Sequence, residues 1–375
     1  MNSLTSLCIF ILILFIYIHI AHQYKKSEEL EIYETDFSNK GHFEDVCELK
    51  QPVLINMKTI LPTLFDNLNP ENIAQFSKYE VNIKDNNDYF ATEDTCIDPV
   101  YLPLHTSIKF MESDVSSHLF SENNQEFLED SGLLKKMEAC DTILKPPFTI
   151  YQNYDLLFGS CNTQTPFKYH KDSRQFLCVT HGKVKIKMTS WKSSKYLYPF
   201  KDYVNYEFRS SVNPKQPQSK YINDYEKINF IEFYINAGYI LYIPPYWWYS
   251  ISYLDDPTTF ICNIKYNTFI NCTSNIWDLA LYFLQQQNIT KKVKKIHKDE
   301  EIETDEIIEE NTSEHIEEMN KIEEIDKIVA KPIDTENSEE ILQTEENNHD
   351  DAIENQKIKP LIHPKDNIQY VISDI

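Results

Sequence analysis

The pattern of hydrophobic and polar residues changes several times along the chain, and it begins with an unbroken apolar segment over residues 4–21. A helix of that length spans roughly 27 Å, close to the apolar thickness of a bilayer. No basic residue precedes the segment and no small-residue cleavage site closes it, so the sequence favours a transmembrane signal-anchor over a cleaved signal peptide. Lys25 and Lys26 follow directly, which predicts a single-pass membrane protein whose folded part is cytosolic.

The segments after this apolar run predict a β-rich domain with helices on either side. Residues 22–45 are polar and predict a stalk. Residues 148–270 contain short apolar runs separated by turn signals, which is typical of an all-β barrel or sandwich. Residues 275–287 place apolar side chains on one helical face, which predicts a helix that covers the barrel or joins two copies in a homodimer.

The distribution of charge separates the folded part from a tail. The chain has a net charge of −23, and most of the acidic excess lies between Lys298 and Glu354, where aromatic residues are almost absent. Low hydrophobicity with high charge favours disorder. We therefore predict four regions: a transmembrane segment over 4–21, a stalk over 22–45, a folded domain over 46–290 with its barrel core at about 148–270, and a disordered acidic tail over 291–375.

Composition also argues against two classes of function. Basic residues cluster in one short run over 291–295, so we expect no nucleic-acid partner. The eight cysteines show no zinc-like spacing. The chemistry must therefore be sought within the β-rich region.

The most informative stretch of that region covers residues 237–253 and reads AGYILYIPPYWWYSISY. It starts at Gly238, one of five glycines in the chain, and continues as an apolar strand. A Pro-Pro pair then precedes Trp247, Trp248 and Tyr249. The pattern predicts two short strands around a tight corner.

This stretch resembles a late strand of the JmjC and cupin-like Fe(II)/2-oxoglutarate oxygenases. In that superfamily, Gly-Asp-x-Leu-x-Ile-Pro-x-x-Trp-Trp-His carries an iron-binding histidine, and Tyr249 stands in its place. Blocks at 157–172 and 176–188 match in the right order, so the resemblance covers residues 151–266. The run is closest to that of the asparaginyl hydroxylase of hypoxia-inducible factor. The resemblance implies a mainly β (α+β) fold, a double-stranded β-helix of the jelly-roll type with flanking helices.

The resemblance also implies an iron site of two histidines and one carboxylate. His170 and Asp172 match the expected His-x-Asp pair and are the candidate metal ligands, with Tyr249 at the third position. The register is awkward, however. Counting forward from Thr165-Pro166 places the first ligand on Lys168, whereas counting back from Phe176 and Gly182 places it on Tyr169.

The 2-oxoglutarate anchor is the second feature that the resemblance implies. A lysine two residues after the hairpin glycine would hold this cosubstrate, and here that residue is Val184. The strand alternates, so we expect Val184, Ile186 and Met188 to face inward and the lysines between them outward. Thr165 and Asn263 match the remaining positions that contact 2-oxoglutarate, and they are the candidate cofactor-binding residues.

Three interpretations follow. The first is a membrane-anchored, catalytically degenerate relative of the 2-oxoglutarate-dependent protein hydroxylases. It would bind no cofactor, act as a binding or interaction module for an unknown protein partner, and have a pocket lined by Thr165, His170, Trp247, Tyr249 and Asn263. The second is an active hydroxylase with Fe(II) and 2-oxoglutarate, whose third ligand is a residue such as His181. The third is a structural membrane or particle protein.

Overall fold

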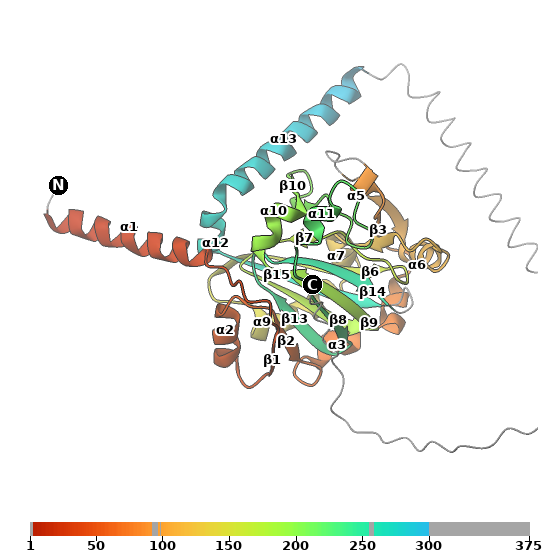
Figure 1. Cartoon of the computed structure of the whole chain (residues 1–375), viewed down its shortest axis with the longest axis horizontal. Coiled ribbons are helices and arrows are strands. Elements are labelled where there is room, and N and C mark those ends of the chain that lie inside the picture. The colour runs from red at the N-terminus through yellow and green to blue at the C-terminus, as the bar shows by residue number, and fades with distance from the viewer. Residues whose placement is uncertain (1–2, 92–96, 98, 255–258, 300–375) are drawn as a thin grey trace, which may run out of the picture. The chain divides into compact units, whose positions relative to one another are not determined.

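The computed structural model describes residues 3–91, 97, 99–254 and 259–299 (Figure 1). It divides into two compact units. The first holds the described residues up to Gln285. The second begins at Gln286, and its described part is the end of helix α13 (Ile276–Asp299). Most of the acidic tail predicted over 291–375, from residue 300 onward, lies outside the described residues.

Strands from two sheets enclose a barrel, and the chain alternates between the sheets as it is traced (Figure 1). The larger sheet supplies β6 (Thr149–Gly159), β8 (Arg174–His181), β13 (Tyr239–Ile243) and β15 (Phe260–Thr268). The smaller sheet supplies β7 (Lys168–Tyr169), β9 (Lys183–Thr189), β12 (Ile231–Asn236) and β14 (Trp248–Tyr253). The orders β13-β8-β15-β6 and β7-β14-β9-β12 form a double-stranded β-helix, as the sequence predicts.

Further strands extend both sheets beyond the barrel. The larger sheet continues through β1 (Tyr33–Asp36), β2 (Val53–Asn56), β3 (Glu80–Asp85), β4 (Val100–Pro103) and β5 (Leu119–Ser121). The smaller sheet continues through β10 (Pro199–Asp202) and β11 (Glu207–Ser210). β11 pairs with β7, so it brings Glu207 next to the strand that carries Lys168.

Strand alternation divides the apolar residues between two cores. Val184, Ile186 and Met188 are fully buried inside the barrel, together with Leu177 and Ile251 from neighbouring strands. The lysines between them face outward, and Lys185 and Lys187 both pair with Glu232. The alternation predicted for residues 183–189 is therefore confirmed. It follows from the period of two, which sends successive side chains to opposite faces of a strand.

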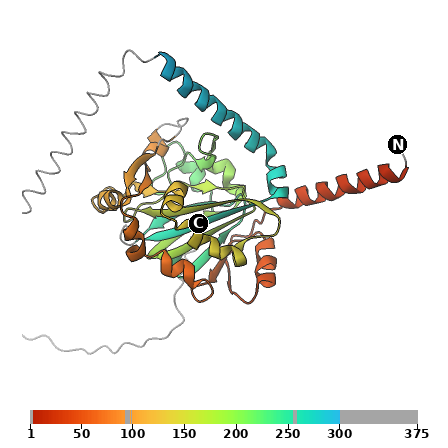
Figure 2. The same ribbon diagram turned by 180° about the vertical axis from the view of Figure 1, so that it is seen from behind.

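Short helices cover the outer face of the larger sheet and build the second core (Figure 2). They are α2 (Lys40–Glu48), α3 (Pro62–Asn67), α4 (Pro70–Ile73), α6 (Leu104–Glu112), α7 (Gln125–Asp130), α8 (Leu134–Met137) and α9 (Asp141–Leu144). The remaining short helices are α5 (Asp88–Ala91), α10 (Ser194–Leu197) and α11 (Ile222–Tyr225). Because both faces of the larger sheet are covered, its central strands β8 and β15 are buried along almost their whole length, although both also contain polar residues.

Residues 22–45 differ from the separate stalk that the sequence predicts. Tyr33–Asp36 forms β1, which pairs in parallel with β2. Phe43 is buried in the outer core and stacks on Phe176 of β8. The polar composition of this segment is misleading because a few apolar residues at suitable spacing are enough to dock it on the sheet.

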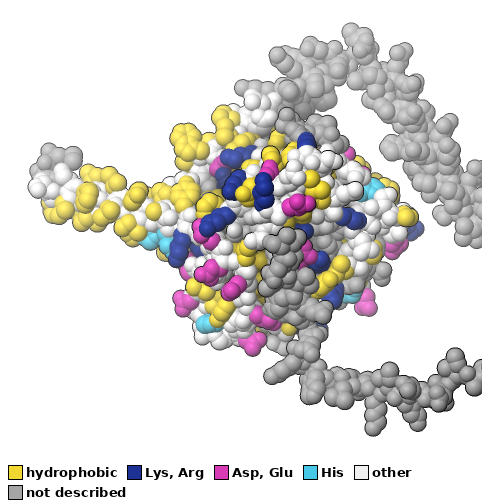
Figure 3. All heavy atoms as spheres, viewed as in Figure 1, with side chains coloured by type: hydrophobic (Ala, Val, Ile, Leu, Met, Phe, Trp, Pro, Cys, Tyr) yellow, Lys and Arg dark blue, Asp and Glu magenta, His cyan; other side chains and the backbone are white. Residues whose placement is uncertain are grey.

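Helix α1 (Ser3–Gln23) is the one described helix long and apolar enough to cross a membrane, and none of it is buried in the fold (Figure 3). A signal sequence near the N-terminus meets the same criteria of length and composition. The end of α1 contacts helix α12 (Phe269–Ser274), and the Tyr24 hydroxyl just after it donates a hydrogen bond to the Ser274 carbonyl. The helix predicted over 275–287 is present as the first part of α13, which continues to Asp299.

The hairpin between β8 and β9 yields a test of the barrel packing. Gly182 has a φ of +80°, and a Cβ added there would lie 2.2 Å from the Thr259 hydroxyl oxygen. We expect Gly182→Ala to lower the free energy of unfolding by about 2–4 kcal/mol, since it adds a collision to left-handed strain. Gly132, at a φ of +72° with nothing within 4 Å of its added Cβ, is the matched control. Urea unfolding of Gly132→Ala should show a loss of about 1–2 kcal/mol, and equal losses for both variants would contradict the packing argument.

Candidate functional site

The strand pair β7–β14 forms the part of the barrel where the resemblance places the iron ligands. Lys168 of β7 lies directly across from Tyr249 of β14. The sequence offers two positions for the first iron ligand, Lys168 and Tyr169. Strand pairing places Lys168 opposite Tyr249. An ammonium group has no lone pair to offer a metal, so the residue opposite Tyr249 is a fixed positive charge.

A buried network of ion pairs surrounds that charge. The Lys168 ammonium donates a hydrogen bond to Glu122 and lies 3.6 Å from a carboxylate oxygen of Glu207. The Lys84 ammonium donates to the same two carboxylates, at 3.0 Å to Glu122 and 2.7 Å to Glu207. Side-chain exposure in these pairs is between 2% and 13%, so solvent screens them little. We call Lys84, Glu122, Lys168 and Glu207 the lysine–glutamate network.

Two members of the network, Lys84 and Glu207, are held in the ionised form despite their burial. Burial opposes the charge on Glu207, but the ammonium groups of Lys168 and Lys84 prevail and hold its pKa well below the usual range. Burial likewise disfavours the ammonium of Lys84, yet the Glu122 and Glu207 carboxylates raise its pKa well above the ordinary value. The network itself therefore pairs two lysines with two glutamates, and it holds no net charge for a divalent ion to balance.

Tyr249 belongs to a chain of hydrogen bonds that crosses three strands. The Gln175 side-chain amide of β8 donates to the Tyr249 hydroxyl oxygen and to the Asn263 carbonyl oxygen of β15, both at 2.9 Å. Burial raises the pKa of Tyr249 to about 12, so the phenol stays protonated at neutral pH. A protonated phenol held in this way is a poor ligand for Fe(II).

His170 and Asp172 lie close together, but the imidazole is already engaged. Its Nε2 lies 3.0 Å from the Ile243 carbonyl oxygen and must donate to it, while Nδ1 is 3.6 Å from a carboxylate oxygen of Asp172. Burial lowers the pKa of His170 to about 4, so the ring is neutral at pH 7. The 3.6 Å contact with Asp172 is therefore not a salt bridge. Asp172 in turn accepts a hydrogen bond from the Asn267 amide at 2.6 Å.

His181 does not join this pair. It ends β8 opposite Phe260, whereas Gln175 lies near the start of the same strand opposite Lys265. Six residues of extended strand separate the two ends by about 20 Å. Among the described residues, no group of three or more His, Cys, Asp or Glu side chains is placed to hold a metal ion. The residues present therefore do not fit the iron centre that the resemblance implies.

The two candidate cofactor-binding residues are tied to the protein itself. The Thr165 hydroxyl oxygen accepts a hydrogen bond from the Ile251 backbone at 3.0 Å. Asn263 accepts from Gln175, as described above. Val184, at the expected anchor position, lies inside the barrel and carries no charge.

Lys265 is a barrel-facing cation that sequence reasoning missed. It is half-buried on β15 and shares the inner face with Asn263, two residues earlier. Burial disfavours its charge, but Asp172, Tyr249 and Asp155 raise its pKa. The period of two along β15 was sufficient to find it. No such local signal marks Lys84, Glu122 or Glu207, which come from segments outside the matching blocks.

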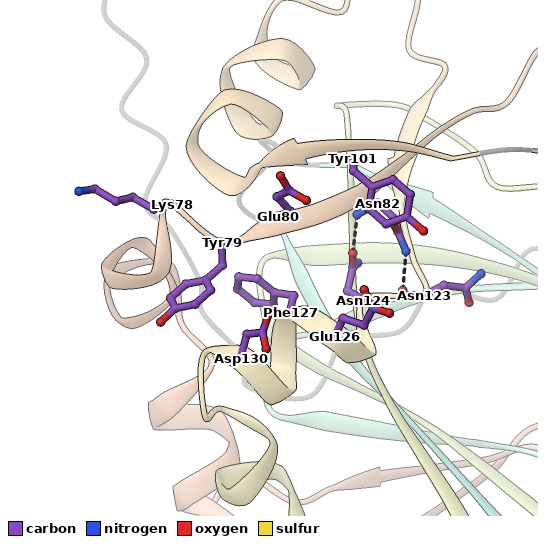
Figure 4. A pocket seen from close by; sticks show the side chains of 10 residues that line it. All are labelled: Lys78, Tyr79, Glu80, Asn82, Tyr101, Asn123, Asn124, Glu126, Phe127 and Asp130. Atoms are coloured by element: carbon purple, nitrogen blue, oxygen red, sulfur yellow. Dashed lines mark hydrogen bonds between the residues drawn. The ribbon is translucent and has the colours of Figure 1, made fainter. Parts of the chain in front are cut away.

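A small surface cavity of about 230 Å³ lies outside the barrel, between β3, β4 and α7 (Figure 4). Asn82 donates from its backbone to the Asn124 side chain at 2.8 Å and from its amide to the Asn123 carbonyl at 2.6 Å. On its far side, Asp155 accepts hydrogen bonds from the backbones of Asn123 and Asn124. The cavity has a mostly polar lining and contains none of the network residues, although Asn123 in its wall directly follows Glu122 in the chain.

Comparison with known proteins agrees with this architecture. Residues 21–272 match the family described as Cupin-like domain. The chain belongs to the cupin-like family. The family match begins before β1, as expected if residues 22–45 are part of the domain. A second match, 34% identical over 96 residues, is to JmjC domain-containing protein D of Dictyostelium discoideum. It covers 26% of this chain and 21% of that relative, so it spans about a fifth of the relative's length.

A lysine inside the barrel and a lysine on its outer face should contribute unequally to the stability of this cupin-like domain. Lys168→Met leaves two buried carboxylates with one cation, so we expect the free energy of unfolding to fall by about 3–5 kcal/mol. Lys185→Met, on the outer face of β9, should cost under about 1 kcal/mol because its pairing with Glu232 is more exposed. Urea unfolding of the two variants measures the difference. Similar losses would show that the network is not a buried stabilising unit.

Stability below neutral pH should depend on His170. Its pKa falls from 6.5 to about 4 on folding, so the unfolded chain binds the proton more tightly. Stability from this group is therefore present above pH 6.5 and is lost as the pH falls through about 4. We expect the stability difference between wild type and His170→Asn to change by on the order of 3 kcal/mol over that range. Other groups cancel in the difference, and a flat difference would contradict a neutral buried ring.

Proposed function

We propose that this chain is a membrane-tethered cupin-like barrel that acts as a binding or interaction module and does not use Fe(II) and 2-oxoglutarate. The observation that carries the proposal is the pairing of Lys168 with Tyr249 inside the lysine–glutamate network. A fixed ammonium in this position both removes a metal ligand and repels a divalent cation.

The charge balance of the barrel supports the proposal. In a 2-oxoglutarate-dependent site, a metal cation and protein ligands share the interior with a dianionic cosubstrate. Here Lys84 and Lys168 neutralise Glu122 and Glu207 directly, and the expected anchor position is the apolar Val184. A working iron site would need several side chains to change together, because each charged side chain of the network is paired with another.

Helix α1 supports the tether. Its apolar side chains are exposed along its length, and none of its residues is buried in the fold. Lys25 and Lys26 at its end favour a cytosolic domain. Lys26 also lies over the rings of Trp191 and Tyr246, at 4.8 Å and 4.1 Å from their centroids, so the connection to the barrel is short.

Two other functions are alternatives to this proposal. An active hydroxylase would need a third ligand, and the candidate His181 lies at the far end of β8. A purely structural membrane or particle protein would use the anchor without a ligand or partner in the barrel. Metal binding and turnover distinguish the first of these from the proposal.

The test compares wild type with a variant that restores the superfamily ligands in the forward register. Lys168→His, His170→Asp and Tyr249→His together place two histidines and one carboxylate on β7, its extension and β14. We expect wild type to bind Co(II) at least roughly tenfold more weakly than this triple variant in anaerobic titrations followed by visible absorbance. Lys168→Met alone controls for loss of the network and should bind no better than wild type.

Two results would overturn the proposal. The first is stoichiometric iron in wild-type protein purified without oxygen, lost on changing His170 or Asp172. The second is succinate formation from 2-oxoglutarate with Fe(II) and ascorbate, above the rate of a Tyr249→Phe control. Either result would favour an active hydroxylase with an atypical site.

A further inference from the structure

The first turns of α13 have two chemically distinct faces. One face binds the barrel: Asp278 pairs with Lys171 and accepts a hydrogen bond from the Tyr203 hydroxyl at 2.8 Å, and the Tyr282 ring contacts Tyr206. The opposite face is apolar and turned to solvent. It consists of Ile276, Trp277, Ala280, Leu281, Phe283 and Leu284, which follow one another at helical spacing.

This apolar face is unusually exposed for a folded domain. Trp277 is 81% exposed, and Ile276, Leu281, Phe283 and Leu284 are each between 47% and 62% exposed. Phe269 of α12 is 60% exposed and lies just before them in the chain. Exposed apolar groups that cluster in this way mark a surface that another phase or molecule covers. We call Phe269, Ile276, Trp277, Leu281 and Leu284 the α12–α13 patch.

A neighbouring loop adds to the patch. The Phe269 backbone donates a hydrogen bond to the Phe148 carbonyl oxygen at 3.1 Å, which fixes the two residues side by side. Phe148 is 86% exposed, and Ile150 two residues later is 61% exposed. The apolar surface therefore continues from α12 to the start of β6.

The position of α1 identifies what covers this surface. The end of α1 contacts α12, and Tyr24 directly after it is hydrogen-bonded to Ser274. If α1 crosses a bilayer, Ser274 must therefore lie at the bilayer surface. Trp277 follows three residues later in the chain, in the first turn of α13. Tryptophan is enriched at that boundary because its ring is apolar and its N–H is polar.

We infer that the α12–α13 patch rests in the lipid headgroup region and holds the barrel against the membrane that α1 enters. The barrel-binding face of α13 fixes the orientation, since Asp278 and Tyr282 point toward the protein and the apolar face points away from it. A second copy of the chain is the rival occupant. It fits less well, because a second copy bound to this face would have to occupy the space beside the bilayer surface, where α1 leaves the membrane. The inference rests on the proposed membrane tether.

The test measures the depth of Trp277 in the full-length protein, reconstituted in phosphatidylcholine vesicles with acyl chains brominated near the headgroup. The fluorescence that disappears in Trp277→Phe is the signal of Trp277. We expect brominated vesicles to quench this signal by roughly half or more, as for a tryptophan at the interface. The double variant Leu281→Ser with Leu284→Ser should reduce the quenching, because it removes apolar contacts that hold α13 at the surface. Val115→Ser, a change at a residue that is 97% exposed on another part of the domain, should leave it unchanged.

The outcomes separate the inference from the tether. Unquenched Trp277 in a chain whose α1 resists alkaline carbonate extraction would overturn the inference and leave the tether intact. Efficient disulfide crosslinking of Leu281→Cys between two copies, with Trp277 unquenched, would overturn it in favour of a homodimer through 275–287. Loss of α1 from the mature chain, read from its mass, or release by carbonate would overturn the tether and the inference together. Far-UV circular dichroism checks that each variant remains folded.

Discussion

The buried lysine–glutamate network is the interaction on which the rest of the barrel interior depends. It joins β3, the segment after β5, β7 and β11, so it ties the accessory strands to both barrel sheets. Each of its four charges is stable at this depth only because the others are present. The pairing of β7 with β14 places Lys168, a member of the network, opposite Tyr249.

Apolar packing stabilises the fold alongside this network. One apolar core fills the barrel and a second lies between the larger sheet and its covering helices. Polar residues of β8, β14 and β15 lie beside these cores, where the Gln175 amide donates to Tyr249 and Asn263, and Asp172 accepts from Asn267. These ion pairs and amides therefore lie next to apolar packing that fills the barrel and covers the larger sheet.

Apolar and charged side chains occupy separate parts of the surface of the domain. Apolar side chains gather where α1, α12 and the start of α13 meet, while β9 turns Lys185 and Lys187 to the outer face of the smaller sheet, where both pair with Glu232. The short link through Lys26 and Tyr24 keeps the domain close to the end of α1. Helix α1 and the barrel are thus joined by a short connection, in contrast to a domain on a free stalk.

The sequence by itself determined the barrel, because a period of two and well-placed glycine and proline residues are local properties of each strand. It also determined the inward position of Val184, the apolar segment of α1 and the helix at 275–287. Tertiary structure alone decided the partner of Tyr249, since one residue of register in β7 separates Lys168 from Tyr169 and only strand pairing selects between them. It also decided the environment of Lys168: Lys84, Glu122 and Glu207 are distant in the chain, and no local pattern specifies which buried charges will meet. The docking of residues 22–45 could not be predicted for the same reason. It depends on the surface of the sheet, which other parts of the chain form.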